Sequence, residues 1–189
     1  MIKLLNPGIP EHWASIEADI TGRVHDAGLP APATEGVVEV DGRPGVVLER
    51  VDGETMWDRM KVAPEEVPHL TEVLIDIQTD LHAAPAVEGL PLLATRLRRK
   101  IEEATQLPEA ERAESLGMLA RARQGMALCH GDMHPANIVL STRGMVIVDW
   151  YDAAIGDAQA DLARSSLLLR PAETEASRAT HLEGATDAF

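Results

Sequence analysis

The hydrophobic pattern at the start of the chain predicts a short strand followed by a helix. Residues 1–5 are apolar around a single lysine and run into an Asn-Pro-Gly turn, which is typical of a short strand. Residues 11–27 carry apolar side chains at steps of three and four, the period of an amphipathic helix, and Gly28 is well placed to end it. Glu17 follows an apolar position and is expected on the flank of this helix.

Two pairs of short apolar runs predict two β-hairpins. The first pair is 36–40 and 45–48, on either side of Asp41-Gly42, a dipeptide that favours tight hairpin turns. The second pair is 138–140 and 145–148, around a polar turn at 141–144. A further apolar run at 126–129 precedes a polar loop that extends to residue 137.

The remaining segments favour helices. Helical character begins near Glu54, and apolar residues repeat at helical spacing over 67–81, which predicts a core helix. Two helices that meet near Leu107 are expected before residue 123, and another over 157–169. The tail from 171 to 189 is polar, rich in small residues and expected to be poorly ordered.

Composition narrows the class of protein. The chain has 189 residues with 31 acidic and 17 basic side chains, a net charge of −14, so we expect no nucleic-acid partner and no membrane partner. One cysteine cannot form a disulfide within the chain, and the first residues lack the pattern of a secretory signal, which together predict a reducing, cytoplasmic setting. The acidic balance mildly favours a cationic ligand.

One segment concentrates the residues suited to chemistry. Residues 130–137 read HGDMHPAN, and an aspartate follows the second predicted hairpin at position 149. The hairpin brings Asn137 and Asp149 to the same end, with Asp132 just before it, so the three side chains can converge. Carboxylate and amide oxygens suit Mg²⁺, and a carboxylate that does not bind the metal can accept a hydroxyl proton. This arrangement is the one used for phosphoryl transfer.

The order and spacing of these residues resemble those of a known group of kinases. A His-x-Asp with four residues before Asn, and a later Asp, follow the pattern of the protein-kinase catalytic loop. The residues that depart from that pattern, among them Gly131, His134 and Trp150, make the segment resemble the aminoglycoside phosphotransferase and choline kinase family. Supporting stretches lie at 28–32, 41–53, 81–85, 156–157 and 161–163.

The resemblance implies a role for each matching residue. Asp132 would be the catalytic base, Asn137 and Asp149 would hold Mg²⁺, and the donor would be ATP or GTP. Lys3 would pair with the nucleotide phosphates and with Glu17. Backbone groups between Glu49 and Val51 would bind the purine base. His130 and Asp161 would support the catalytic loop.

The resemblance also implies an α+β, protein-kinase-like fold of two lobes. An incomplete N-terminal nucleotide-binding lobe would span residues 1–52, and a mainly helical catalytic lobe residues 53–189. Family members have a strand, a phosphate-covering loop and a second strand before the lysine strand, and further helices at the end, so this chain is expected to be truncated at both ends. The implied activity is Mg²⁺-dependent transfer of a γ-phosphoryl group to a hydroxyl of an aminoglycoside, choline or a similar amino alcohol, a sugar, or an amino acid such as homoserine. Oligomeric state stays open.

Two other functions fit some of the same residues. His130, Asp132, His134 and Asp149 could bind Zn²⁺ or a pair of metal ions, as in hydrolases. That hypothesis leaves Asn137 and the lysine strand unexplained. The other alternative is an inactive pseudoenzyme or fragment that binds nucleotide without turnover.

Overall fold

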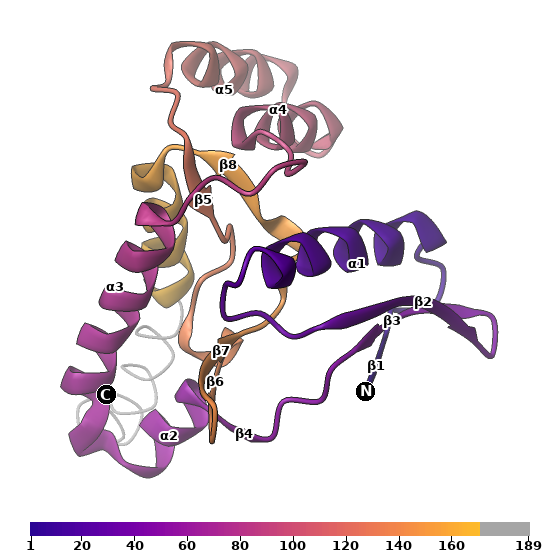
Figure 1. Ribbon diagram of the computed structural model, residues 1–189. Helices are drawn as coiled ribbons and strands as arrows, with labels where there is room; N and C mark the ends of the chain where they lie inside the picture. Colours follow the sequence, from indigo (N-terminus) through magenta and orange to yellow (C-terminus); the bar gives the residue numbers. More distant parts are fainter. Residues whose placement is uncertain (171–189) are drawn as a thin grey trace, which may run out of the picture.

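The computed structural model describes residues 1–170, and its first part is a three-stranded antiparallel sheet covered by a helix (Figure 1). The strands are β1 (Ile2–Leu4), β2 (Thr34–Val40) and β3 (Arg43–Leu48), in the order β1-β3-β2. Asp41 and Gly42 both have positive φ, 51° and 72°, the signature of the tight turn that matches strand twist. The predicted strand and the first predicted hairpin are therefore confirmed.

Helix α1 (Glu11–Asp26) packs on this sheet and also reaches the main core. Ala14 and Ala18 face the sheet with Val46, whereas Ile20 and Val24 join the larger core cluster. Burial of the helix on two sides also encloses Glu17. Glu17 is only 3% exposed and lies inside, not on an open flank.

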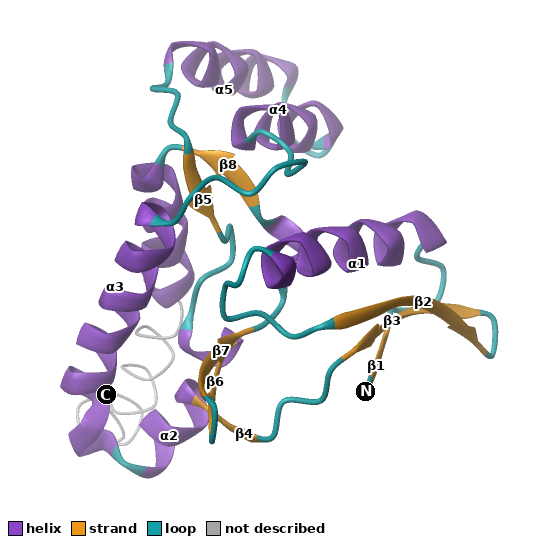
Figure 2. Cartoon of the chain, viewed as in Figure 1, coloured by secondary structure: helices purple, strands orange, loops and turns teal. Residues whose placement is uncertain are grey.

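The chain passes from β3 to a second sheet through residues 49–52 (Figure 2). That sheet has the order β4-β6-β7, with β4 at Gly53–Thr55, β6 at Ile138–Ser141 and β7 at Gly144–Ile147. The second predicted hairpin is thus confirmed. The helix expected from residue 54 begins two residues later, because β4 pairs with β6 and Thr55 then caps the helix by accepting a hydrogen bond from the Asp58 backbone amide.

Helices build the rest of the described chain. They are α2 (Met56–Val62), α3 (Val67–Ala83), α4 (Leu93–Glu103), α5 (Glu109–Arg121) and a final helix over 158–170. The helix over 158–170 runs alongside α3 (Figure 1). Helices α4 and α5 pack against each other at the end of the molecule near β5 and β8 (Figure 1). The core helix, the helix pair and the final helix were all expected. The predicted disorder of 171–189 lies outside the described residues.

A two-stranded sheet connects the helices to the candidate site. β5 (Ala127–Cys129) pairs antiparallel with β8 (Ala154–Gly156), a strand that the sequence analysis did not predict. Leu128, Met133 and Trp150 are fully buried around it and belong to the largest core cluster. Loop 130–137 leaves β5 and enters β6, so buried strands hold both of its ends. Within the described part of the chain, no helix is long and apolar enough to cross a membrane.

Candidate active site

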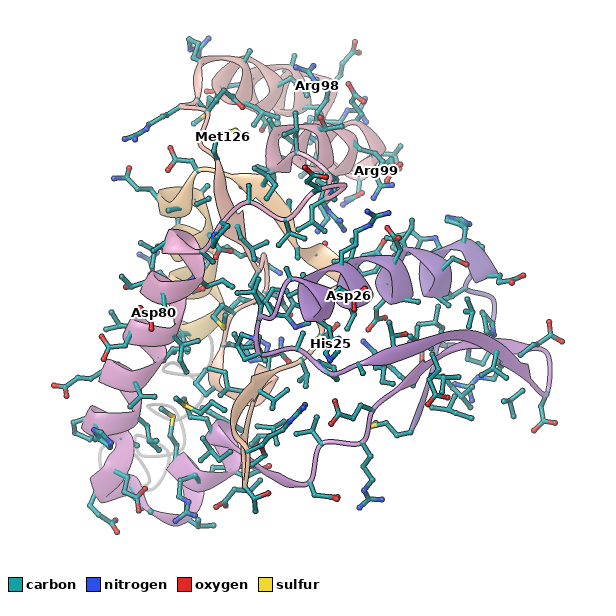
Figure 3. The ribbon with its side chains drawn as sticks, viewed as in Figure 1. His25, Asp26, Asp80, Arg98, Arg99 and Met126 are labelled. Carbon is teal, nitrogen blue, oxygen red and sulfur yellow. The ribbon has the colours of Figure 1, made fainter. Side chains whose placement is uncertain are left out.

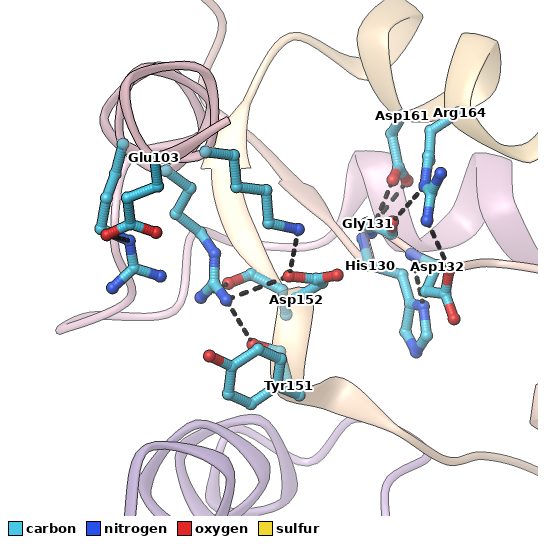
Figure 4. A network of polar contacts seen from close by, with 12 residues as sticks. Glu103, His130, Gly131, Asp132, Tyr151, Asp152, Asp161 and Arg164 are labelled. Carbon is cyan, nitrogen blue, oxygen red and sulfur yellow. Dashed lines mark hydrogen bonds and ion pairs between the residues drawn. The ribbon is translucent and has the colours of Figure 1, made fainter. Parts of the chain in front are cut away.

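Loop 130–137 is held by one buried carboxylate, that of Asp161 (Figure 4). Asp161 accepts backbone hydrogen bonds from Gly131 at 2.7 Å and His130 at 3.3 Å, and it is 2% exposed. Gln78 and His82 on α3 also donate to it, at 3.1 Å and 2.8 Å. Burial alone would raise the pKa of Asp161, but these hydrogen bonds outweigh it and lower the pKa. A buried anion therefore fixes the loop to two helices.

His130 has both ring nitrogens engaged inside the protein. Its Nδ1 accepts a hydrogen bond from the Asp132 backbone amide, so Nε2 carries the proton and donates to the Val148 carbonyl at 3.1 Å. Complete burial lowers its pKa, which keeps the ring neutral. Trp150 packs against it edge-on with ring centroids 4.7 Å apart. His130 thus positions the loop, and metal ligation would require breaking these bonds.

The Asp132 carboxylate is partly exposed and surrounded by donors. Arg164 approaches its Oδ1 at 3.2 Å, His134 lies 3.6 Å from Oδ2, and Asn137 Nδ2 lies 3.4 Å from the same oxygen. The contact with His134 is the largest influence on Asp132 and, with the charge of Arg164, lowers its pKa despite partial burial. Asp132 is therefore ionised at neutral pH. Sequence reasoning missed the contact with Arg164, because the helix that carries it lies 32 residues further along.

Asn137 and Asp149 are fixed by the backbone of the second hairpin. The Asn137 carbonyl accepts a hydrogen bond from the Val148 amide at 2.9 Å, which places the two residues at the same end, as predicted. Asn137 Nδ2 donates to the Asp132 carbonyl at 2.9 Å, so its side-chain oxygen remains available. Asp149 adopts a left-handed conformation with φ of 65°, an unusual geometry for a residue other than glycine. Such strain is commonly found at functional sites.

Lys3 connects the first sheet to this hairpin. Its Nζ lies 2.6 Å from Glu17 Oε1 and 2.9 Å from Asp149 Oδ1. Burial alone would lower the pKa of Lys3, but the hydrogen bonds to the two carboxylates outweigh it and raise the pKa. Burial raises the pKa of Glu17, and the ammonium of Lys3 opposes that rise. The lysine is therefore charged and held between the two acids.

A cavity of about 320 Å³ unites the residues expected to bind nucleotide and metal. Six of them line it: Lys3, Glu17, Glu49, Val51, Asn137 and Asp149. Leu48, Val139 and Val148 supply apolar walls. The volume falls within the range of small-molecule sites.

The 49–51 segment at one edge of this cavity is fixed through Glu49. The Glu49 backbone amide donates to the Ala33 carbonyl at 2.7 Å, and its carboxylate accepts from the Ala33 amide and from Arg143. The backbone hydrogen bond from Ala33 is the largest influence that lowers the pKa of this carboxyl. The Val51 amide has no hydrogen-bond partner within residues 1–170. The segment is thus rigid at Glu49 and offers a backbone donor at Val51.

The histidines and acids proposed as zinc ligands are not gathered into a common site. Among the described residues, the group that could share an ion consists of His82, Cys129 and Asp161, whose ligand atoms lie within 4.8 Å of one another. Both oxygens of Asp161 already accept hydrogen bonds. Burial, followed by the charge of Asp161, raises the pKa of Cys129 to about 12, so its thiol stays protonated. This cluster is a packed part of the loop support.

Comparison with known proteins places this geometry in context. The model of the phosphotransferase enzyme family, APH, matches residues 8–188. Among curated proteins no sequence match is found. Three similar solved structures are an aminoglycoside 3'-phosphotransferase of type VIII (21% identity, TM-score 0.56), an aminoglycoside phosphotransferase of Streptomyces rimosus in complex with ADP and streptomycin (20%, 0.59), and a choline/ethanolamine kinase family protein of Mesorhizobium loti (21%, 0.51).

The likeness to these structures covers most of this chain but less of theirs. It covers 87%, 90% and 86% of this chain, respectively. The corresponding shares of those proteins are 67%, 71% and 59%. At these identities the likeness concerns the fold, which is the α+β, kinase-like fold expected from the catalytic-loop motif.

Proposed function

The chain belongs to the phosphotransferase enzyme family, and from this premise we propose that it transfers the γ-phosphoryl group of ATP or GTP to a hydroxyl of a small molecule. The observation that carries the proposal is the convergence of Lys3, Asn137 and Asp149 on one cavity, with Asp132 held beside Asn137. Phosphoryl transfer depends on positioned groups of this kind. The Streptomyces rimosus structure contains ADP and streptomycin, which supports a nucleotide donor and a hydroxyl acceptor.

Asp132 is proposed as the catalytic base. Its carboxylate is ionised and partly exposed, so it can accept the proton of an acceptor hydroxyl. In the proposed reaction the hydroxyl oxygen forms a bond to the γ-phosphorus while the bond from that phosphorus to the bridging oxygen breaks. The nucleoside diphosphate leaves, and the hydroxyl proton passes to Asp132.

Asn137 and Asp149 fit a magnesium ion by the chemistry of their oxygens. The side-chain amide nitrogen of Asn137 is used by Asp132, which directs the hard amide oxygen elsewhere, and Asp149 has a second carboxylate oxygen besides the one that contacts Lys3. When bound, Mg²⁺ would neutralise charge on the nucleotide phosphates. Lys3, kept in place by Glu17, would add a second positive charge there.

The 49–51 segment is proposed as the contact for the purine base. The Glu49 amide is occupied by Ala33, so the Val51 amide is the proposed donor to the base. This segment lies at the apolar edge of the cavity, beside Leu48.

Calorimetric titration with ATP and with GTP, each with and without Mg²⁺, tests the nucleotide site. We expect Mg²⁺-dependent binding of at least one nucleotide. An Asp132→Asn variant should keep that affinity. Its rate of ADP or GDP release in the presence of hydroxyl acceptors should fall by about 10²-fold or more. Asp80→Asn is a matched control, because Asp80 is an exposed aspartate on α3 (Figure 3).

The outcomes separate the possible functions. Nucleotide binding without turnover towards any acceptor would assign the chain to the pseudoenzymes. Equal turnover in Asp132→Asn and the unmodified chain would remove Asp132 as the base. Zn²⁺ binding in place of nucleotide binding would favour the hydrolase.

A further inference from the structure

A second, smaller cavity lies on the α4 side of the catalytic loop. It has a volume of about 90 Å³, and its wall includes Gly131 of the loop, Arg96 and Lys100 of α4, and Arg164 of the last described helix. A single water molecule needs about 10–15 Å³ of such space, so the cavity has room for a small polar group. Its position beside Gly131 makes it a candidate for the acceptor side of the site.

The charge of this cavity is opposite in sign to that of the chain. Three cations line it, Arg96, Lys100 and Arg164, against two carboxylates, whereas the whole chain has 17 basic and 31 acidic residues. One of those carboxylates, Asp161, already accepts hydrogen bonds from the loop and from α3. The other, Asp152, is shared by two cations. The lining of this cavity therefore carries a net positive charge inside a strongly acidic protein.

The ion pairs at Asp152 do not use all the hydrogen-bond donors of the two cations (Figure 4). A single oxygen, Oδ1, accepts from Arg96 at 3.2 Å and from Lys100 at 2.8 Å. Arg96 is 7% exposed and is further fixed by the Tyr151 carbonyl at 2.7 Å, yet its buried Nε has no hydrogen-bond partner among the described residues. A buried donor without a protein partner is costly unless a ligand or an ordered water meets it. Arg96 is thus a rigid cation with a spare donor.

Contacts on the other side of the cavity lead to the proposed base. Arg164 lines the cavity and also donates to Asp132 Oδ1 at 3.2 Å. Gly131, the residue before Asp132, lies so near Asp152 that an added Cβ would be 2.6 Å from the Asp152 carbonyl oxygen. Arg164 and the Gly131 backbone therefore connect the cationic wall to the Asp132 carboxylate, which does not itself line this cavity.

Resting on the proposed function, we propose that the acceptor is a small hydroxy acid, whose carboxylate binds at Arg96 and Lys100 while its hydroxyl faces Asp132. Arginine and lysine donors bind carboxylates through charge-assisted hydrogen bonds. An acceptor with an ammonium group would instead meet like charge. The carboxylate of the acceptor takes no part in bond making, and the hydroxyl is phosphorylated as described above.

Three compounds with the same diol test the charge preference: glycerate, glycerol and 3-amino-1,2-propanediol. Each is titrated into the full chain by calorimetry, with and without a non-hydrolysable ATP analogue and Mg²⁺. We expect glycerate to bind about tenfold more tightly than the neutral or the cationic compound. sn-Glycerol 3-phosphate is the fourth probe, and tighter binding of it would assign the cavity to phosphorylated alcohols and overturn the hydroxy-acid proposal.

A pair of variants on α4 locates the site. Lys100→Met should weaken glycerate binding about three- to tenfold, whereas Arg98→Gln, which removes an exposed cation from the same helix, should leave it unchanged (Figure 3). Unchanged glycerate affinity in Lys100→Met, no glycerate binding, or a preference for the amine each overturns the proposal. Failure of the nucleotide to bind would instead overturn the proposed function. The two failures can be told apart because glycerate binding is also measured without nucleotide.

Discussion

Lys3 donates a hydrogen bond from Nζ to Glu17 Oε1 across 2.6 Å, joining the first strand to the buried face of α1. The same nitrogen reaches Asp149, 146 residues further along the chain. One ammonium group therefore links the first sheet, the helix and the residue that follows the β6-β7 hairpin. Its position on the cavity wall is the reason to expect a role in nucleotide binding.

Lys3→Met should weaken ATP binding about 10- to 100-fold, because a charge-assisted contact to phosphate contributes roughly 1.5–3 kcal/mol. Calorimetric titration in the presence of Mg²⁺ measures the change. Lys61→Met is the control, since Lys61 is an exposed lysine on α2 that pairs with Asp58. Equal ATP affinity in the Lys3 variant and the unmodified chain would contradict this role.

Gly131→Ala should destabilise loop 130–137 for two separable reasons. The residue has φ of +80°, and an added Cβ would lie 2.6 Å from the Asp152 carbonyl oxygen. Gly144→Ala is a matched control, because Gly144 has φ of +105° but open space around the new atom. We expect the positive φ to cost about 1 kcal/mol in both variants and the clash to add about 1–3 kcal/mol at position 131 only. If the two variants have the same urea midpoint, the clash at position 131 is relieved without a cost in stability.

Local sequence pattern predicted the elements whose partners are close along the chain. The β2-β3 hairpin follows from Asp41-Gly42, and α1 from its apolar period, since both signals lie within the element itself. Strands β4 and β8 have only three residues each and pair with segments whose identity depends on the complete fold. Strand β1 is equally short, but its apolar run before the Asn-Pro-Gly turn is a local signal, and no such signal marks β4 or β8.

In the candidate site, too, the residues with a local sequence signal were predicted and those positioned by distant segments were not. The loop motif led to Asp132, Asn137 and Asp149 because their spacing is itself the signal, although their roles stay predictions. Arg164 and Arg96 carry no motif, and their contacts with the loop depend on how two distant helices pack against it. The burial of Glu17 was missed for a related reason, because α1 is covered on a second side by segments far along the chain.

Cys129 should resist thiol reagents in the folded protein. It is fully buried, and burial, together with the nearby carboxylates of Asp161 and Asp157, raises its pKa to about 12. At pH 8 the thiolate fraction should be about a thousandfold below that of an ordinary thiol, so labelling by a chromogenic disulfide should be slower by at least that factor than in urea. A Cys129→Ala/Ser15→Cys variant, with its thiol on the exposed side of α1, should label rapidly when folded. Rapid labelling of Cys129 in the folded chain would show that the loop support opens readily.

Asp161→Asn should cost about 2–4 kcal/mol of unfolding free energy at neutral pH, because a neutral amide cannot accept the charge-assisted hydrogen bonds from Gly131, Gln78 and His82. The hydrogen bonds hold the pKa of Asp161 below its ordinary value in the folded state. Its contribution is therefore complete above the unfolded-state pKa of about 3.9 and is lost as pH falls through the lower folded-state pKa.

Chemical denaturation between pH 7 and pH 3 tests the sign of this dependence. The unmodified chain should lose stability at acid pH more steeply than Asp161→Asn, so the difference between them should shrink below about pH 4. Asp80→Asn serves as the control, because Asp80 is exposed and should show no such convergence. A stability difference that stays constant down to pH 3 would mean that packing of the side chain, and not its charge, holds loop 130–137 in place.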